Sequence, residues 1–509
     1  MTYYVHSGPR KIALDEVARN GAKLAAGLKD LGIGDGNSYA SFMRNDIAML
    51  ETKVAGNQLG AYSVPVNWHA TAEEAGYMFA DSGAKAIVIH ADLLPGVASH
   101  LPQGVPVLVC STPPEIAGAY GVRPDLCDVP DGMIDYEAWR DGFEPLTGAP
   151  PLQRGSMIYT SGTTGNPKGV RREPTSAERQ ARLAELALRS FGIRPGGVVA
   201  MTGPMYHSAP GAYASIAMSL GNDIHLLPRF EPEGLLQAIH EHKISHMHVV
   251  PTMFVRMLRL PDAVKAKYDL SSLVHVIHGA APCPPEVKRR MIEWWGDVIY
   301  EYYGSTEAGI VTVVNSTDWM NKPGTVGQPL DGQKVTIFDD DGNELGRGES
   351  GEIYMNLNDL SDFTYHNKAD KRAEIERDGM VTNGDVGYID EDGYVYLNDR
   401  KRDMIISGGV NIYPAEIEAA LLEMPGVQDC AVFGIPHEEF GESIAAAIEP
   451  QPGASLSPET VKEFLKAHIS AYKIPREVTF HDAMPREDTG KIFKRKLRQP
   501  YWDAVGRQI

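Results

Sequence analysis

The chain has 509 residues, of which 43% are hydrophobic and 23% charged, so it is long enough for more than one globular domain. Acidic residues outnumber basic ones 67 to 48, and the net charge of -19 argues against a nucleic acid or an anionic membrane as partner. The four cysteines are scattered, which argues against a disulfide framework. No run of about 18 apolar residues exists, which argues against a transmembrane segment. The N-terminus lacks a signal peptide, and together these features favour a cytoplasmic protein.

Helical and strand-like segments alternate from the N-terminus onward. Residues 14–31 carry apolar side chains at helical spacing, and Gly32 follows as a helix end. Short β-branched runs predict buried strands at residues 84–91, 105–111, 196–204, 223–230, 245–252 and 273–281. This alternation predicts an α/β fold, with a large N-terminal layered α/β domain and mostly parallel sheets.

The pattern changes near residue 385, where short strand-like runs are joined by Asp-Gly turns. Amphipathic helices are predicted at residues 413–426, with Pro414 in the first turn, and at 457–469, with a strand at 427–435 between them. These elements predict a small α+β C-terminal domain.

A loop rich in glycine and hydroxyl side chains follows a strand-like run in residues 157–170, MIYTSGTTGNPKGV. Glycine lets backbone N–H groups approach an anion closely, hydroxyl groups add donors, and Lys168 adds a charge. The loop therefore suits phosphate groups, although a plain flexible loop is the alternative. It is not a Walker A loop, because Pro167 precedes the lysine and Gly169 follows it.

Together with six further motifs, this loop closely resembles the adenylate-forming superfamily, which comprises acyl-CoA synthetases, peptide-synthetase adenylation domains and beetle luciferases. The other motifs follow in the family's order: MYHSAP at 205–210, HGAAP at 278–282, YYGSTEAG at 302–309, TNGDVGYIDEDGYVYLNDRKRD at 382–403, ISGGVNIYPAEIE at 406–418 and PREDTGK at 485–491. The chain is similar in particular to AMP-dependent acyl-CoA synthetases, the ligases of fatty acids and of aryl or phenylpropanoid carboxylates.

The resemblance implies an acid–thiol ligase that works in two half-reactions. A small-molecule carboxylic acid attacks the α-phosphate of ATP, giving an acyl-adenylate and pyrophosphate, and coenzyme A then displaces AMP. ATP, Mg²⁺ and coenzyme A are the implied cofactors. Two alternatives remain, namely an adenylating enzyme that loads a carrier protein and a nucleotide-binding scaffold without catalysis. A homodimer is left open.

The residues for ATP follow by resemblance. Thr306 lies near the α-phosphate, and Glu307 binds Mg²⁺, which prefers hard oxygen ligands. Both count as catalytic residues, as does Lys168. The β- and γ-phosphates are assigned to Thr160, Ser161, Gly162, Thr163, Thr164 and Lys168.

The adenosine residues also follow by resemblance. Tyr303 offers an aromatic face to adenine, Asp385 accepts hydrogen bonds from the ribose hydroxyl groups, and Arg400 assists there. The other residues expected around the nucleotide are Gly279, Ala280, Ala281, Pro282, Tyr302 and Gly304.

Lys491 resembles the catalytic lysine of adenylation, which leaves when the small domain rotates for the second half-reaction. The resemblance therefore implies an ATP- and acid-binding domain at 1–401 and a mobile domain at 402–509. The hinge is assigned to Arg402 in the charged run 398–403, where the family usually has Asp or Lys. On charge alone, this run is more simply an ordinary hydrated turn.

Coenzyme A is expected to contact the C-terminal domain. Gly408 and Gly409 would flank the pantetheine arm, since glycine leaves a narrow passage along the backbone, and Phe440 would stack on the adenine. Lys473 and Arg476 are candidates for the phosphates. The other basic residues of this end are interpreted as a solvated helix start: Lys494, Lys496 and Arg498.

The acid pocket is expected around the MYHSAP motif, where His207 resembles the residue that lines or gates the acyl site. The other candidate pocket residues are Tyr206, Tyr213, His248, Val250, Met253 and His278. Each histidine taken alone is more simply a hydrogen-bonded structural residue. Aromatic and imidazole groups suit a cinnamate or benzoate ring, but the segment is equally compatible with a fatty acyl chain, so both substrate classes stay open.

Overall fold

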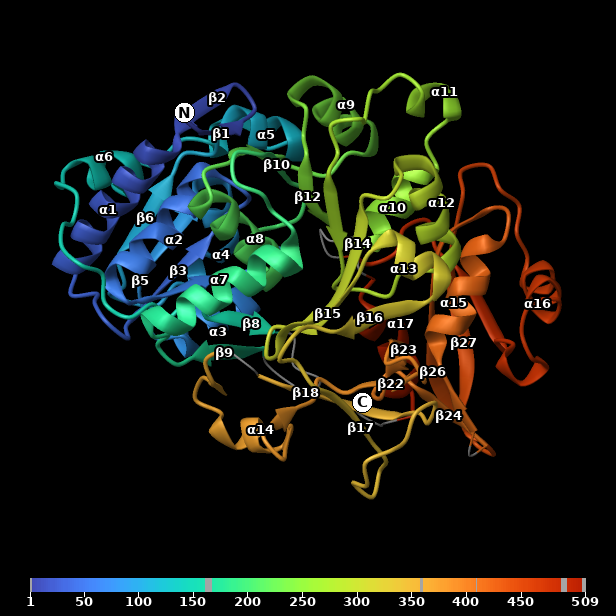
Figure 1. Ribbon diagram of the computed structural model, residues 1–509. Helices are drawn as coiled ribbons and strands as arrows, with labels where there is room; N and C mark the ends of the chain where they lie inside the picture. Colours follow the sequence, from blue (N-terminus) through green and yellow to red (C-terminus); the bar gives the residue numbers. More distant parts are fainter. Residues whose placement is uncertain (1, 161–166, 358–359, 409, 487–491, 506–509) are drawn as a thin grey trace.

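The computed structural model describes residues 2–160, 167–357, 360–408, 410–486 and 492–505. Figure 1 shows a five-stranded sheet with its helices on one side of the molecule, in blue, a large sheet through the middle and a smaller unit at the opposite side, in orange and red. The predicted layered α/β architecture with a small α+β unit at the C-terminal end is confirmed.

The five-stranded sheet is parallel throughout the described residues. Its strands lie in the order β4 (Tyr62–Pro65), β3 (Ser38–Phe42), β5 (Ala84–His90), β6 (Val107–Cys110) and β7 (Ile134–Asp135). Because helices cover both faces of a parallel sheet, its central strands are nearly continuous apolar runs, which is why residues 84–91 could be predicted as a strand.

The large sheet changes character halfway along. Its parallel part, apart from the antiparallel edge strand β2, has the order β2 (Arg10–Ala13), β1 (Tyr4–Ser7), β11 (Asp223–Leu226), β10 (Val198–Met201), β12 (His246–Val249), β13 (His275–His278) and β14 (Ile299–Ser305). The antiparallel part continues with β15 (Gly309–Val314), β16 (Thr325–Pro329), β23 (Val395–Arg400), β22 (Asp385–Ile389), β18 (Gly351–Asn356), β21 (Met380–Val381) and β20 (Glu376–Arg377), while β17 (Val335–Phe338) pairs with β18. The sheet is therefore mixed, because hairpins replace helical crossovers after β14.

Two smaller sheets complete the described fold. A three-stranded sheet is formed by β19 (Phe363–Tyr365), β9 (Lys168–Arg172) and β8 (Ile158–Thr160). The C-terminal unit contains β24 (Ile405–Ser407), β25 (Val410–Ile412), β26 (Val427–His437), β27 (Gly441–Pro450) and β28 (Glu477–Phe480), with helices α15 (Pro414–Glu423), α16 (Pro458–Lys466) and α17 (Lys494–Asp503). Its separate sheet begins four residues after the predicted boundary at 401, which stays a prediction.

Helices α1 (Leu14–Asp30), α2 (Ile47–Leu59) and α8 (Ser208–Ser219) pack between the five-stranded sheet and the parallel part of the large sheet. One core cluster combines buried side chains of these helices with side chains of both sheets, such as Leu24, Leu50, Tyr213, Val88 and Val199. The helix predicted at residues 14–31 is α1. Burial of this layer fixes the position of α8, whose N-terminal end reaches the candidate site.

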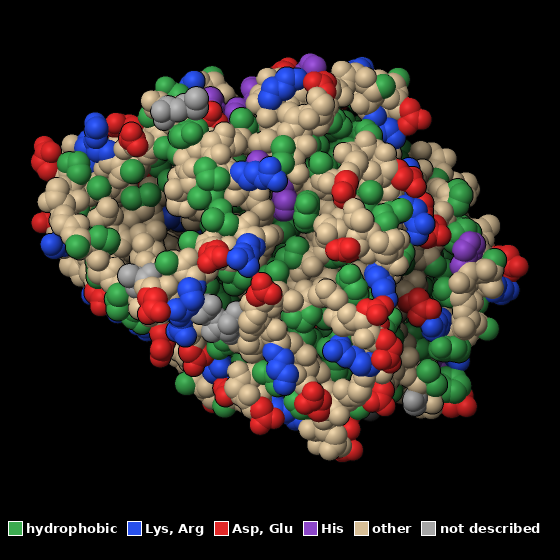
Figure 2. All heavy atoms as spheres, viewed as in Figure 1, with side chains coloured by type: hydrophobic (Ala, Val, Ile, Leu, Met, Phe, Trp, Pro, Cys, Tyr) green, Lys and Arg blue, Asp and Glu red, His purple; other side chains and the backbone are tan. Residues whose placement is uncertain are grey.

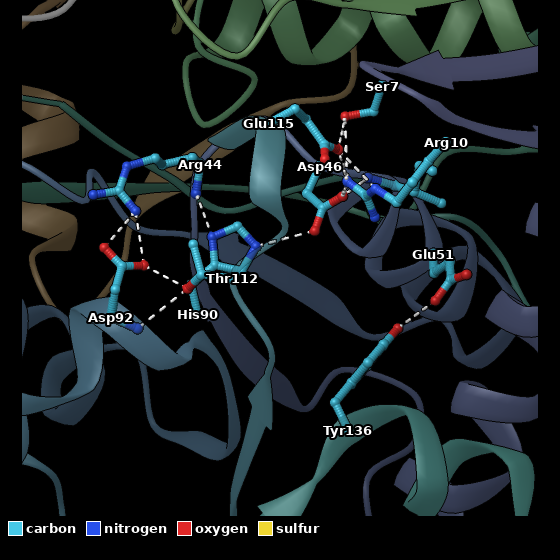
Figure 3. A network of polar contacts seen from close by, with 11 residues as sticks. Ser7, Arg10, Arg44, Asp46, Glu51, His90, Asp92, Thr112, Glu115 and Tyr136 are labelled. Carbon is cyan, nitrogen blue, oxygen red and sulfur yellow. Dashed lines mark hydrogen bonds and ion pairs between the residues drawn. The ribbon is translucent and has the colours of Figure 1, made fainter. Parts of the chain in front are cut away.

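A buried polar network joins the β1–β2 hairpin to the five-stranded sheet (Figure 3). Asp46 precedes α2 and accepts hydrogen bonds from Arg10 Nη2 at 2.5 Å and from His90 Nε2 at 3.1 Å. Arg10 Nε also donates to Glu115 Oε1 at 2.7 Å. Burial opposes ionisation of Asp46, but the hydrogen bond from His90 and the charge of Arg10 outweigh it, and the pKa of Asp46 is lowered.

The Asp46→Asn variant is expected to lower the free energy of unfolding by about 2–3 kcal/mol, because Arg10 and His90 lose the buried charge that both of them contact. Urea unfolding measures the difference. Asp125→Asn is the matched control, since the Asp125 side chain is 67% exposed in its ion pair with Arg123 and should change stability little. Equal stability of both variants would contradict the expectation.

The surface fits the acidic composition. Figure 2 shows acidic, basic and apolar side chains interspersed over one face of the molecule.

All four cysteines are unpaired. None of the helices in the described ranges has the length and apolar character needed to cross a bilayer.

Candidate active site

Two paired strands hold the ends of the predicted phosphate loop. Thr160 ends β8 and Lys168 begins β9, and the two residues are direct partners in the antiparallel register. The Thr160 hydroxyl donates to the Lys168 carbonyl oxygen at 3.4 Å. The predicted site residues that lie outside the described part of the chain are Ser161, Gly162, Thr163, Thr164, Gly409 and Lys491.

Lys168 is directed towards the turn that follows β14. Its Nζ lies 5.0 Å from the centre of the Tyr365 ring, and the Tyr365 hydroxyl donates to Glu307 Oε1 at 2.9 Å. Burial and the charge of Glu307 raise the pKa of Tyr365. Strands β14 and β15 approach so closely before this turn that a Cβ at Gly304 would overlap the Gly309 carbonyl oxygen. Tyr365 therefore links Lys168 to a buried carboxylate, which is 8% exposed.

The turn at Thr306 and Glu307 is held from two sides. Arg172 Nη2 donates to the carbonyl oxygens of both residues at 2.7 Å. Thr306 Oγ1 lies 3.1 Å from the hydroxyl oxygen of Ser208, the first residue of α8. Because a helix N-terminus favours negative charge, this turn brings hydroxyl groups, a carboxylate and a positive helix end together. Such a set can hold a phosphate together with a cation.

A second polar group lies where β22 and β23 pair. Asp385 and Arg400 are register partners, with 3.3 Å between Asp385 Oδ1 and Arg400 Nε. Asp385 Oδ2 accepts hydrogen bonds from the Tyr303 hydroxyl at 2.9 Å and from Asn383 Nδ2 at 2.7 Å. Burial and the charge of Asp385 raise the pKa of Tyr303. The three residues predicted for adenosine are thus adjacent, and their contacts with a nucleotide stay predictions.

The turn after β13 runs along the ring of Tyr302. A Cβ at Gly279 would lie 2.5 Å from this ring, so no larger residue fits without a shift. Ala280 has a φ of 67°, a left-handed conformation that costs a non-glycine residue about 1–2 kcal/mol and is typical of functional sites. Ala281 and Pro282 continue the turn towards the surface.

Two predicted pocket residues, Tyr213 and His248, form a buried aromatic cluster with Tyr302, which the sequence analysis placed around the nucleotide. The Tyr302 hydroxyl lies 3.0 Å from His248 Nε2, and the Tyr213 ring centre is 6.0 Å from that of His248. Burial lowers the pKa of His248 to about 4, so the imidazole is neutral at pH 7. Tyr213 Oη and His248 Nδ1 are buried and have no hydrogen-bond partner among the described residues. A substrate could supply one.

Four further pocket candidates lie at the N-terminal ends of two helices. His207 is the N-cap residue of α8, and its ring centre lies 4.4 Å from that of Tyr206. Val250 is the N-cap residue of α10 (Pro251–Leu258), where it is buried together with Met253. All four therefore flank the N-terminal ends of two helices.

His278 is placed differently. It is fully buried, its ring packs edge-on against Phe254, and its Nε2 lies 3.7 Å from Glu301. Glu301 in turn pairs with the buried Lys288 at 2.6 Å. Burial and the charge of Lys288 lower the pKa of His278 well below its ordinary value. The structure thus places His278 beside a buried charge pair, but neither ring nitrogen has a hydrogen-bond partner among the described residues, so it is not the hydrogen-bonded structural histidine that the sequence suggested.

Part of the predicted coenzyme A site is assembled in the C-terminal unit. Gly408 has a φ of 60°, and its N–H donates to the Phe440 carbonyl oxygen at 2.9 Å. The Arg476 guanidinium lies 4.8 Å from the centre of the Phe440 ring. Lys473 instead pairs with Glu416 at 2.5 Å. Arg476 is therefore better placed than Lys473 to meet an anion beside Phe440.

The candidate hinge lies directly before the C-terminal sheet. Arg402 is followed by Asp403, with 3.9 Å between the charged groups, and burial lowers the pKa of Arg402. Asp399 Oδ2 accepts a hydrogen bond from the Ala415 N–H at 2.9 Å, in the first turn of α15. The charged run therefore contacts both units, although its role as a hinge stays a prediction.

Two basic residues near the C-terminus are not solvated as interpreted from the sequence. Lys494 pairs with Glu418 at 2.7 Å and is 24% exposed, and Arg498 lies 3.6 Å from Asp403 and is 17% exposed. The reason is that α17 packs against β26, which turns these side chains towards carboxylates of the same unit.

Four residues of the site were not singled out from the sequence. Ser208 and Asn383 stand inside the MYHSAP and TNGD motifs, where their position beside a predicted residue was a usable signal. Tyr365 and Arg172 belong to no motif, and only the pairing of β9 with β19 brings them to Glu307.

Comparison with known proteins places these residues in a family. The family model described as "AMP-binding enzyme" matches residues 2–360, and that of the "AMP-binding enzyme C-terminal domain" matches residues 416–491. The feruloyl-CoA synthase of an Amycolatopsis species is 31% identical over 98% of this chain and 95% of its own. The fatty acid–[acyl-carrier-protein] ligase ScoC of Streptomyces coeruleorubidus is 30% identical over 98% and 93%. The structure of ATP-bound MatB from Rhodopseudomonas palustris is similar with a TM-score of 0.84 and 27% identity, covering 99% and 96% of the two chains.

Proposed function

Because the chain belongs to the AMP-binding enzyme family, we propose that it is an AMP-forming carboxylic acid–coenzyme A ligase. The observation that carries this proposal is the continuous polar row from Lys168 through Tyr365 and Glu307 to Thr306 and Ser208. It combines a cation, a buried carboxylate and a helix N-terminus, as the transfer of an adenylyl group from a polyanion requires.

In the first half-reaction, Lys168 and Thr160 hold the outer phosphates while Thr306 and the N-terminus of α8 face the α-phosphate. The carboxylate of the acid attacks the α-phosphorus, and pyrophosphate leaves. Asp385, positioned by Tyr303 and Asn383, orients the ribose. By resemblance, Lys491 contributes a further positive charge.

Glu307 fits a magnesium ion, because its carboxylate is held in place by Tyr365 next to the phosphate site. Mg²⁺ bound there would neutralise charge on the phosphate oxygens. The second half-reaction is assigned to a rotated state of residues 402–509 about Arg402. The coenzyme A thiol then passes Gly408, and Phe440 with Arg476 receives the adenine and phosphates.

The acid is proposed to be aromatic or fatty and to enter the pocket formed by His207, Tyr213, His248 and Tyr302. The Tyr213 hydroxyl and His248 Nδ1, which have no hydrogen-bond partner within the described ranges, favour an aromatic acid with a polar substituent. One relative is a feruloyl-CoA synthase and another acts on fatty acids, so both classes belong in the test. A cytoplasmic location is part of the proposal, and a homodimer stays open.

The test is pyrophosphate release from ATP and Mg²⁺ with a panel of fatty, benzoic and cinnamic acids. Free coenzyme A and a phosphopantetheinyl carrier protein are compared as acceptors. Release with one acid class and formation of the coenzyme A thioester would support the proposal and identify the acid. Thioester formed on the carrier protein alone would replace it with the carrier-loading function. ATP binding without release for any acid would favour a scaffold.

A further inference from the structure

A cleft of about 410 Å³ opens between α1, α2 and α8, and none of the residues that line it belongs to a motif. This volume lies within the range of roughly 300–1,000 Å³ typical of small-molecule sites. Ser215 and Met218 line it from one face of α8. Tyr213 lies on the opposite face of the helix, because residues two positions apart point to opposite sides. Figure 2 shows this part of the surface hollowed.

Two charged residues line the cleft, Asp15 of α1 and Lys53 of α2, and Lys53 is the cation. In the described part of the chain it makes no hydrogen bond or ion pair, and burial alone lowers its pKa to about 8. Its ammonium group reaches the first turn of α8, where a Cβ at Gly211 would lie 2.9 Å from Nζ. Only a glycine at this position leaves room for the lysine in its observed place.

The Lys53 ammonium group lies in an electrostatically unfavourable place. The N-terminal turn of a helix carries a partial positive charge, so a cation beside it is unfavourable. A partly buried ammonium group without a partner adds a desolvation cost. Asp15 is the acidic residue of the cleft, and it stands at the exposed rim without pairing with Lys53. An anion bound at Nζ would give the ammonium group a partner of opposite charge.

We propose that the cleft is a second ligand site, which binds a small organic carboxylate with its charged group on Lys53. The apolar body of the ligand lies against Leu14, Val54 and Met218, and the hydroxyl group of Ser215 is available to its polar substituents. The site does not depend on the proposed ligase reaction, since none of its residues belongs to the motifs.

The test is calorimetric titration of the whole chain with hexanoate and with hexanesulfonate, which stays anionic at every pH used. Lys53→Met keeps the length of the side chain and removes its charge. We expect it to bind both anions about tenfold more weakly than the wild type. Asp15→Asn removes a repulsive charge and should bind about twofold more tightly. Lys29→Met, in the exposed last turn of α1, is the matched control and should bind as the wild type does.

The pH dependence separates Lys53 from other cations. Because only the protonated amine attracts the anion, hexanesulfonate affinity should fall above pH 8, by about tenfold per pH unit. Lys53→Met should lack this dependence and should unfold at a temperature no lower than the wild type. Equal affinities of Lys53→Met and wild type, or a wild type that binds neither anion, would overturn the proposal.

Discussion

The Glu307→Gln variant is expected to form acyl-adenylate and pyrophosphate about 100- to 1,000-fold more slowly than the wild type. The amide oxygen can still accept the hydrogen bond from Tyr365, so the turn after β14 should keep its conformation. The variant lacks the negative charge of the Glu307 carboxylate, which is proposed to bind Mg²⁺. The measurement is pyrophosphate release at saturating ATP with the acid identified by the panel.

The second half-reaction provides the internal control. Thioester formation from a supplied acyl-adenylate needs no charge on Glu307, and we expect Glu307→Gln to retain it within about threefold. Glu286→Gln, an exposed residue at the start of α12 (Pro285–Trp295), should leave both steps unchanged. If Glu307→Gln reduced both half-reactions equally, the assignment of this carboxylate to ATP activation would be wrong.

Mild acid is expected to destabilise the protein strongly between pH 7.5 and 5.5. Five histidines are buried in the parallel part of the large sheet: His225 in β11, His246 and His248 in β12, and His275 and His278 in β13. Burial lowers their pKa values to about 3 for His225 and His275, to about 4 for His246 and His248, and well below the ordinary value for His278.

The direction in which stability changes with pH follows from proton linkage. An unfolded histidine has a pKa near 6.5, so below that pH the unfolded chain binds protons that the folded chain excludes. Stability is fully present above pH 6.5 and is lost as the pH falls. Between pH 7.5 and 5.5, each buried histidine lowers the free energy of unfolding by about 1.4 kcal/mol. The total free energy of unfolding of a folded domain is only about 5–15 kcal/mol. The buried carboxyls of Glu51 and Glu301 have raised pKa values and oppose this loss.

Urea unfolding at pH 7.5 and 5.5 measures the effect, and we expect a net loss of at least about 3 kcal/mol. His246→Asn removes one buried proton-binding site and should reduce the pH-dependent loss by about 1.4 kcal/mol. His468→Asn changes an exposed histidine and should leave it unaltered. A loss that is the same for His246→Asn and the wild type would contradict the expectation that this imidazole stays neutral in the folded protein.

The motifs of this chain determined its family, the order of its site residues and the class of reaction. This is possible because phosphate binding and adenylyl transfer need particular side chains at short, fixed spacings, as in the stretch from Thr160 to Lys168. Local patterns also predicted α1, β5, β6 and α15, since each buries a regular apolar pattern of its own residues. The antiparallel part of the large sheet was predicted less well, because its short strands carry weaker patterns.

Only the tertiary structure decided which residues complete the site. Tyr365 reaches Glu307 across 58 residues, Ser208 reaches Thr306 across 98, and Arg172 reaches Thr306 across 134. Such contacts follow from strand pairing and from the packing of α8 between two sheets, which no local pattern encodes. The same holds for Lys53, which has no partner among the described residues because of how three helices meet in the folded chain. The sequence therefore determined the class of reaction. Packing decided which residues support the motif residues of the site and formed the cleft between α1, α2 and α8.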